Sequence, residues 1–267
     1  MSATTTWGEL DPTPPSFWRI LRLETWTELV KLWRLPMYTL PTLTFPLMFY
    51  IIFGVVISPP TGGSVTMATY LIATYGVFGV MGASLFGLGV GLATERGQGW
   101  MVFKRATPMP PMVHILARSL VAMLFGAIVV AELFIVGMLF GGVEMSAATI
   151  VSLSAILIVS SLPFTAIGLA LGYLCKPNSA PAVINMLYLP LSVASGLWIP
   201  IQVFPEWLQS VATFLPPFHA AQLALDRVGV EPLVDPLVSV AVLVVTTVAF
   251  VGITIVAYRR DDGATWG

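Results

Sequence analysis

Residues 94–111 read TERGQGWMVFKRATPMPP, and this polar stretch interrupts a chain that is otherwise rich in apolar residues. It contains three of the twelve Lys and Arg residues. The apolar stretches on either side are each long enough to cross a bilayer. Because a charged segment broken by Gly and Pro cannot stay in hydrocarbon, we expect it to lie in water against the membrane. Its positive charge predicts the cytoplasmic side.

The composition indicates an integral membrane protein. Of the 267 residues, 57% are hydrophobic and 9% are charged, and the mean hydropathy is +0.90. A soluble domain carries about 25% charged residues, so this chain has too little charge to cover a water-soluble surface. The net charge of −1 argues against nucleic acid as a partner, because nucleic-acid-binding proteins present a basic patch.

Six apolar stretches predict an all-α fold with a single six-helix transmembrane domain over residues 16–260. A spanning helix needs about 20 mostly apolar residues, and the fifth stretch is the shortest. The predicted spans are Met37–Ile57, Met67–Ala93, Ile115–Phe140, Thr149–Leu174, Pro181–Ile199 and Pro236–Tyr258.

The distribution of Lys and Arg predicts the orientation. With six spans, eleven of the twelve fall on one side, and only Arg227 falls on the other, among several acids. By the positive-inside rule, both termini are then cytoplasmic. Residues 1–15 have no basic start and no apolar core, so we expect a disordered cytoplasmic tail and not a signal peptide. Residues 261–267 form a second cytoplasmic tail.

Residues 16–35 predict an amphipathic helix in the cytoplasmic interface. One face is polar, and tryptophans on another face suit headgroup depth. Glu28 and Lys31 are three residues apart on the polar face and can pair. The helix is either an anchoring collar or a lever that contacts a cytoplasmic partner.

The charged residues of 199–235 are mostly acids, which places this stretch on the outer side of the membrane, yet it is rich in Trp, Phe, Leu and Pro. Pro216 and Pro217 break any single helix through them. We expect two short helices that lie on the outer leaflet or dip into it as a re-entrant element. Irregular backbone at membrane depth needs cover from protein or water, so the element is expected near the exit of a pathway.

The sequence carries no motif of a self-contained enzyme. The patterns G-x-x-x-x-G-K-[ST], H-E-x-x-H and G-x-S-x-G are all missing. The two histidines, His114 and His219, fall on opposite sides of the predicted membrane and cannot share one metal. We therefore expect no catalytic residue, no metal and no cofactor bound by this chain.

Glu132 is the only acid inside a predicted span. An intramembrane acid is costly and normally faces protein or water, so it is either a polar point on a transport pathway or an acid bonded to a neighbouring helix. The fifth predicted span carries Asn185, Ser192 and Ser195, and Trp198 lies near its end. These residues either line a translocation route or join helices.

The second predicted span carries a small residue at every fourth position. This spacing forms a smooth stripe that lets another helix approach closely. The stripe serves either packing within the chain or a pore-lining or subunit-contact face. Its members are Gly79, Ala83, Gly87 and Gly91.

In this order and topology, the features resemble the permease subunits of type-2 ABC exporters over residues 16–260. The loop reads Glu95-Arg96-Gly97-Gln98-Gly99, then Arg105-Ala106-Thr107-Pro108 and Pro110-Pro111, which is similar to the family's Glu-Arg-x-x-Gly…Ala-Thr-Pro…Pro segment. The family's pattern between the last two spans is matched by Leu197-Trp198-Ile199-Pro200, Phe204-Pro205-Glu206-Trp207-Leu208 and Leu215-Pro216-Pro217. One departure is Gly97, which stands where many relatives have a second acid, and Gly99-Trp100 replaces their Gly-Thr pair. The compact size is most similar to daunorubicin-resistance-type drug-export permeases.

The resemblance implies a division of labour between chains. Two copies of a separate ATP-binding subunit would hold ATP and Mg and hydrolyse the ATP, and two copies of this permease would pair with them in a bacterial inner membrane. Residues 94–113 and the interfacial helix would receive the motion. The implied coupling residues are Glu95, Arg96, Gly97, Lys104, Arg105, Thr107, Pro108, Glu28 and Lys31. Lys104 and Arg105 either pair with acids of the partner or only fix the topology.

The cargo implied by the resemblance is a hydrophobic or amphipathic, drug-like compound. A lipid or lipid-linked glycan is the alternative. A stand-alone secondary transporter or channel would usually show several intramembrane charges or inverted repeats, and a membrane enzyme or assembly factor is a third hypothesis. The sequence shows one intramembrane acid, no convincing repeat and no convergent catalytic set.

Overall fold

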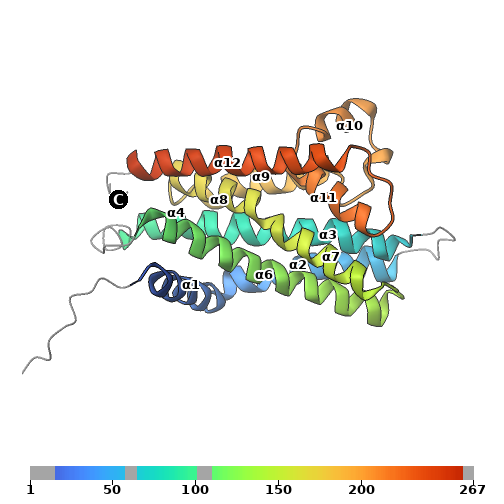
Figure 1. Cartoon of the computed structure of the whole chain (residues 1–267), viewed down its shortest axis with the longest axis horizontal. Helices are drawn as coiled ribbons and strands as arrows, with labels where there is room; N and C mark the ends of the chain where they lie inside the picture. Colours follow the sequence, from blue (N-terminus) through green and yellow to red (C-terminus); the bar gives the residue numbers. More distant parts are fainter. Residues whose placement is uncertain (1–15, 58–64, 101–109, 261–267) are drawn as a thin grey trace, which may run out of the picture.

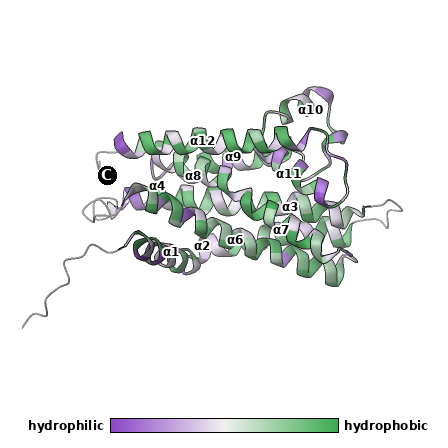
Figure 2. Cartoon of the chain, in the orientation of Figure 1, coloured by the Kyte–Doolittle hydropathy of each residue, from purple (hydrophilic) through white to green (hydrophobic). Residues whose placement is uncertain are grey.

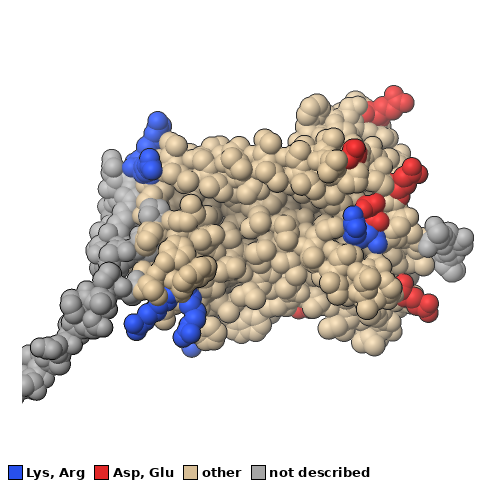
Figure 3. Space-filling view, in the orientation of Figure 1, with Lys and Arg blue, Asp and Glu red and all other residues tan. Residues whose placement is uncertain are grey.

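The structure, a computed structural model, describes residues 16–57, 65–100 and 110–260, and all regular structure within these ranges is helical. The helices form an elongated bundle (Figure 1). Apolar residues cover most of its length (Figure 2). On the face shown in Figure 3, most of the Lys and Arg lie at one end, and most of the acids lie near the other, where a basic side chain is also seen. Apolar sides between charged ends are typical of a membrane protein.

Five helices are long and apolar enough to cross a membrane, and they confirm five of the predicted spans. Their bounds are Pro36–Val56, Met67–Gly97, Met112–Phe140, Ala147–Leu174 and Pro236–Arg260. The elements that build them are α2 (Pro36–Tyr50) with the π-helical η1 (Ile51–Val56), α3 (Met67–Ser84) with the π-helical η2 (Leu85–Val90) and α4 (Gly91–Gly97), α6 (Pro111–Phe140), α7 (Ala147–Val159) with α8 (Ser161–Leu174), and α12 (Pro236–Arg260).

The fifth predicted span is only partly helical, so six spanning helices are not confirmed. Its helix, α9 (Ala180–Ala194), has 15 residues, a length of about 22 Å at 1.5 Å per residue. It ends because Gly196 takes a left-handed φ of 73°, and the Leu197 amide bonds back to the Ser192 carbonyl at 3.0 Å. The sequence prediction counted this helix-ending glycine as part of the span.

The outer element is a set of three short helices, where the sequence predicted two. They are η3 (Ile201–Val203), α10 (Glu206–Ala212) and α11 (Pro216–Arg227). Pro216 and Pro217 begin α11, which confirms the predicted break. Buried His219 donates from Nε2 to the Thr213 carbonyl at 2.8 Å, and α11 packs against α3 and α12. Re-entry into the outer leaflet stays a prediction.

The predicted interfacial helix is α1 (Phe17–Trp33), which lies against α6. Its start is capped by Ser16, whose hydroxyl accepts from the Arg19 amide at 3.4 Å. Glu28 is buried, so the acidic face turns toward the bundle. The exposed face carries three tryptophans, Trp18, Trp26 and Trp33.

The core is built around α3, which is buried along nearly its whole length. A Cβ added to Gly79 would lie 2.4 Å from Val129 of α6, and the Tyr38 hydroxyl of α2 donates to the Ala83 carbonyl at 3.0 Å. Gly87 also faces Tyr38, whereas Gly91 has open space beside it. Three members of the predicted stripe therefore pack within the chain.

A second set of small residues lets α8 and η2 approach backbone to backbone. A Cβ at Gly89 would lie 2.9 Å from the Gly168 carbonyl oxygen, and a Cβ at Gly172 would lie 2.8 Å from the Gly89 carbonyl oxygen. Such contacts favour close packing of membrane helices. The sequence prediction did not include Gly168 and Gly172, because their partner helix was unknown.

Replacing Gly172 by Ala should destabilise the protein. The new methyl group meets a backbone oxygen that no side-chain rotation can move, and overpacking of this kind costs about 1–3 kcal/mol. We expect a lower unfolding temperature for G172A in detergent, followed by intrinsic fluorescence. The matched control is G252A in α12, where nothing lies within 4 Å of the added Cβ. Equal unfolding temperatures for the two variants would contradict the predicted packing.

Candidate functional site

Arg118 is the centre of a charge cluster inside the bundle. It lies on α6 and is 0% exposed. Its Nη2 bonds to Glu95 Oε2 of α4 at 2.6 Å and to Glu28 Oε1 of α1 at 3.2 Å. Its Nη1 donates to the Leu88 carbonyl of η2 at 3.3 Å. One guanidinium on α6 is therefore bonded to α1 and to the end of the second span, which is formed by η2 and α4.

Lys31 completes this cluster from α1. Its ammonium pairs with Glu28 and with Glu95, so the Glu28–Lys31 pairing predicted from the spacing is confirmed. The Lys31 side chain is 33% exposed, whereas those of Glu28 and Glu95 are 3% and 11% exposed. We call Glu28, Lys31, Glu95 and Arg118 the charge cluster. It holds two anions and two cations, and Lys31 is its most solvent-exposed member.

A second polar contact lies one helical turn away. His114 Nδ1 is 3.5 Å from Glu24 Oε1, again between α6 and α1. Glu24, Glu28 and His114 present ligand atoms within 4.8 Å of one another, a spacing that could hold a metal ion. Because Arg118 and Lys31 already neutralise Glu28, the arrangement fits a set of ion pairs between α1 and α6 better than a metal centre.

The charge cluster stabilises the fold only while all of its charges remain paired. Desolvation of each charge is costly and is offset only when every charge is paired in good geometry. Removing one partner from such a pair costs about 3–5 kcal/mol. Since the partners come from α1, α4 and α6, a displacement of one of these helices strains the other two.

Arg96 fastens α4 to a different neighbour, the end of α8. Its Nη1 donates to the carbonyls of Gly172 at 2.8 Å and Cys175 at 3.3 Å, and its guanidinium lies 5.6 Å from the centre of the Tyr173 ring. A cation is favourable at the carbonyl end of a helix. Burial raises the pKa of the Cys175 thiol, and the charge of Arg96 opposes this rise.

Comparison with known proteins identifies the family. Residues 20–226 match the sequence profile of the family described as ABC-2 type transporter. The chain belongs to the ABC-2 type transporter family. It is also 27% identical over 209 residues to a protein of Bacillus subtilis (strain 168) named "Putative transport permease YvfS", a match that covers 78% of this chain and 85% of that protein. The resemblance inferred from the loop is thereby confirmed.

The permease brings several of the predicted coupling residues together. Glu28, Lys31 and Glu95 meet in the charge cluster, and Arg96 extends from the same helix toward α8. A Cβ at Gly97 would lie 2.8 Å from Pro177, so this glycine permits a close contact. The remaining predicted coupling residues lie outside the described ranges: Lys104, Arg105, Thr107 and Pro108. The coupling role of the whole set stays a prediction.

Three members of the site were missed from the sequence: Arg118, His114 and Glu24. For Arg118 a signal was present, because an arginine within an apolar stretch must find a partner. In the sequence, Arg118 contributes only to the count of Lys and Arg that predicts the orientation of the bundle. Glu24 lies on the predicted polar face of residues 16–35, but no local pattern indicates that it faces His114.

The permease does not gather the predicted pathway residues onto one surface. Asn185 is exposed on α9, whereas Ser192 is buried and donates to the Leu189 carbonyl at 2.8 Å. Buried Ser195 follows α9. The Trp198 ring lies 4.8 Å from that of Phe49 and 5.6 Å from that of Phe78, within the aromatic core.

Glu132 is half-buried on α6. Its Oε2 is enclosed and has no hydrogen-bond partner among the described residues. An enclosed, unbonded carboxyl oxygen in a membrane helix is costly unless the group is neutral. Both of its predicted roles, on a pathway or bonded to another helix, stay open.

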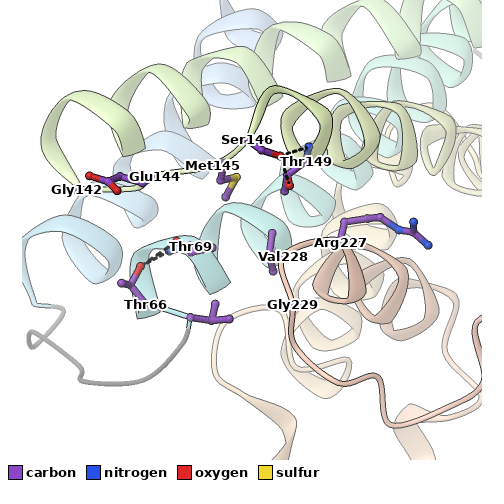
Figure 4. Close-up of a pocket in the computed structure, with 11 residues that line it drawn as sticks. Thr66, Thr69, Gly142, Glu144, Met145, Ser146, Thr149, Arg227, Val228 and Gly229 are labelled. Carbon is purple, nitrogen blue, oxygen red and sulfur yellow. Dashed lines mark hydrogen bonds between the residues drawn. The ribbon is translucent and has the colours of Figure 1, made fainter.

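A polar hollow of about 520 Å³ lies between the starts of α3 and α7 and the end of α11 (Figure 4). Thr66 and Ser146 cap the two helices there and accept from the amides of Thr69 and Thr149 at 3.2 and 3.1 Å. Glu144 and Arg227 line the same hollow, so its charges are mixed.

Replacing Arg118 by Leu should destabilise the permease by about 3–5 kcal/mol, because two buried carboxylates would then share only Lys31. Adding E28Q should recover much of this loss, since the Lys31–Glu95 pair then remains balanced. Thermal unfolding of the purified permease measures both effects. The control is R227Q, which removes an exposed pair with Asp226 worth about 0–1 kcal/mol. Equal effects of R118L and R227Q would exclude a structural role for the charge cluster.

Proposed function

We propose that this permease is the membrane subunit of an ATP-driven exporter in a bacterial inner membrane. Two copies pair with two copies of a separate ATP-binding subunit, which holds ATP and Mg and hydrolyses the ATP. Both termini are cytoplasmic. Closure of the ATP-binding subunits pushes on residues 94–113 and on α1, and the spans respond by opening a route for cargo.

The observation that carries this proposal is the position of the charge cluster. It joins α1, the end of the second span and the beginning of α6 near the end of the bundle that collects Lys and Arg, which the positive-inside rule assigns to the cytoplasm. A force on the loop after α4 therefore reaches α1 and α6 together. This arrangement supports transmission through residues inside the bundle, while the loop surface meets the partner.

Exposed apolar faces support the pairing with a second copy. In the single chain, α12 is largely uncovered, and α2 and α9 each present an apolar face. Met186, Leu189 and Val193 recur at helical spacing on the exposed face of α9. Lipid and a second permease are the two surroundings that suit such faces.

The cargo follows from the apolar character of the spans and from the resemblance to drug-export permeases. We propose a hydrophobic or amphipathic compound, with a lipid or lipid-linked glycan as the alternative. The five spans described by the structure contain two acids: Glu95, which lies near the end of its span and is ion-paired, and Glu132, which lies far from a span end. Since a secondary transporter usually relies on several intramembrane charges, that hypothesis is weaker.

Reconstitution tests the division of labour. The permease alone in vesicles should move no hydrophobic dye uphill, whereas vesicles that also contain a co-purified soluble chain with a G-x-x-x-x-G-K-[ST] loop should do so when ATP is added. The control is the same complex in which the lysine of the G-x-x-x-x-G-K-[ST] loop in the soluble chain is replaced. Uphill transport by the permease alone would overturn the proposal.

The charge-balanced double variant E95Q/K31M tests transmission. It removes the link from α1 to α4 and leaves Glu28 paired with Arg118, so insertion and assembly should stay normal. We expect transport per ATP hydrolysed to fall by about tenfold, a typical size for coupling between sites. The matched control is D226N/R227Q, which removes the exposed pair of α11. Unchanged transport per ATP in E95Q/K31M would remove the charge cluster from the coupling route.

A further inference from the structure

A groove of about 660 Å³ runs between α1 and α6, on the faces of both helices that turn away from the charge cluster. Its lining is almost entirely apolar. Trp26 and Trp33 flank it on α1, and Ala127 and Ala131 are among the side chains of α6 that line it. A volume of this size is typical of sites that enclose most of a small ligand, about 300–1,000 Å³.

Arg34, which directly follows α1, is the sole charged residue of the groove lining. Its side chain is exposed, and it makes no ion pair within residues 16–57, 65–100 and 110–260. An arginine suits a phosphate, because its planar fork offers paired donors. The groove therefore combines a long apolar slot with a single cation at its rim.

The tryptophans indicate how deep this groove lies. Trp26 and Trp33 are 64% and 56% exposed, whereas other aromatic residues such as Tyr75 and Phe78 are buried in the core. Exposed tryptophans with an apolar body and one polar group favour the headgroup level of a membrane. At that level the molecules that combine an acyl chain with a negative headgroup are anionic phospholipids.

We propose that the groove holds a resident anionic phospholipid, with one acyl chain along α6 and the phosphate on Arg34. Such a lipid fastens α1 to α6 from the face opposite the charge cluster. The helix is then held on one side by ion pairs and on the other by lipid. This inference concerns lipid binding by the permease itself and does not depend on the proposed export function.

Native mass spectrometry of the full-length permease in detergent tests the proposal. The protein is incubated with equal amounts of phosphatidylglycerol and phosphatidylcholine that carry the same acyl chains. Wild type should retain phosphatidylglycerol preferentially. In R34Q, the ratio of retained phosphatidylglycerol to retained phosphatidylcholine should fall about fivefold, which is the effect of one basic residue on an anionic lipid. R34K should keep most of this preference. A131F, which fills the slot, should lower the retention of both lipids.

Two controls separate the groove from the general surface. R22Q removes an exposed arginine of the same helix outside the groove, and A241F adds the same bulk on the exposed side of α12. Equal retention of the two lipids by wild type, or equal effects of R34Q and R22Q, would overturn the headgroup site. Unchanged retention in A131F, or a loss equal to that in A241F, would overturn the acyl-chain site. Arg34-dependent, ATP-driven transfer of the same lipid across vesicles would make it cargo and overturn its resident role.

Discussion

A buried guanidinium cannot exist without anions beside it, and this requirement organises one end of the molecule. Arg118 has no exposed surface, so the folded state must bring carboxylates to it. One comes from α1 and the other from α4, which are separated along the chain by the first span and most of the second. Arg118 therefore holds α1, the end of the second span and the start of α6 together through ion pairs.

Stability alone is a weak reason for such an arrangement, because well-packed apolar residues can often replace a buried ion pair without loss. What ion pairs add is a defined geometry: Glu95 turns toward α1 and α6 while Arg96, the next residue, turns toward the carbonyls at the end of α8. The short helix α4 is thus held from two directions. These contacts make α4 a firmly held base, which supports the proposed transmission of force to α1 and α6.

Hydropathy was sufficient to predict five spans and the all-helical fold, because bilayer thickness fixes the length of an apolar helix. Hydropathy overestimated the fifth span, since Gly196 is nearly neutral on a hydropathy scale and yet ends a helix. Within the site, the Glu28–Lys31 pair followed from helical spacing alone. The link from Glu95 to Arg118 did not, because it depends on how α4 and α6 pack, and no local pattern encodes that contact. The close approach of Gly89 to Gly168 was missed for the same reason.

The brevity of α9 has a consequence for the surrounding lipid. A helix of 15 residues is some 8 Å shorter than a hydrocarbon core of about 30 Å. Such a mismatch is relieved when the bilayer thins or when flanking side chains stretch to the interface, each at a small energetic cost per ångström. A sixth crossing, as the sequence predicts, would therefore require either a thinner bilayer beside α9 or completion of the crossing by the buried residues that follow it, such as Leu197.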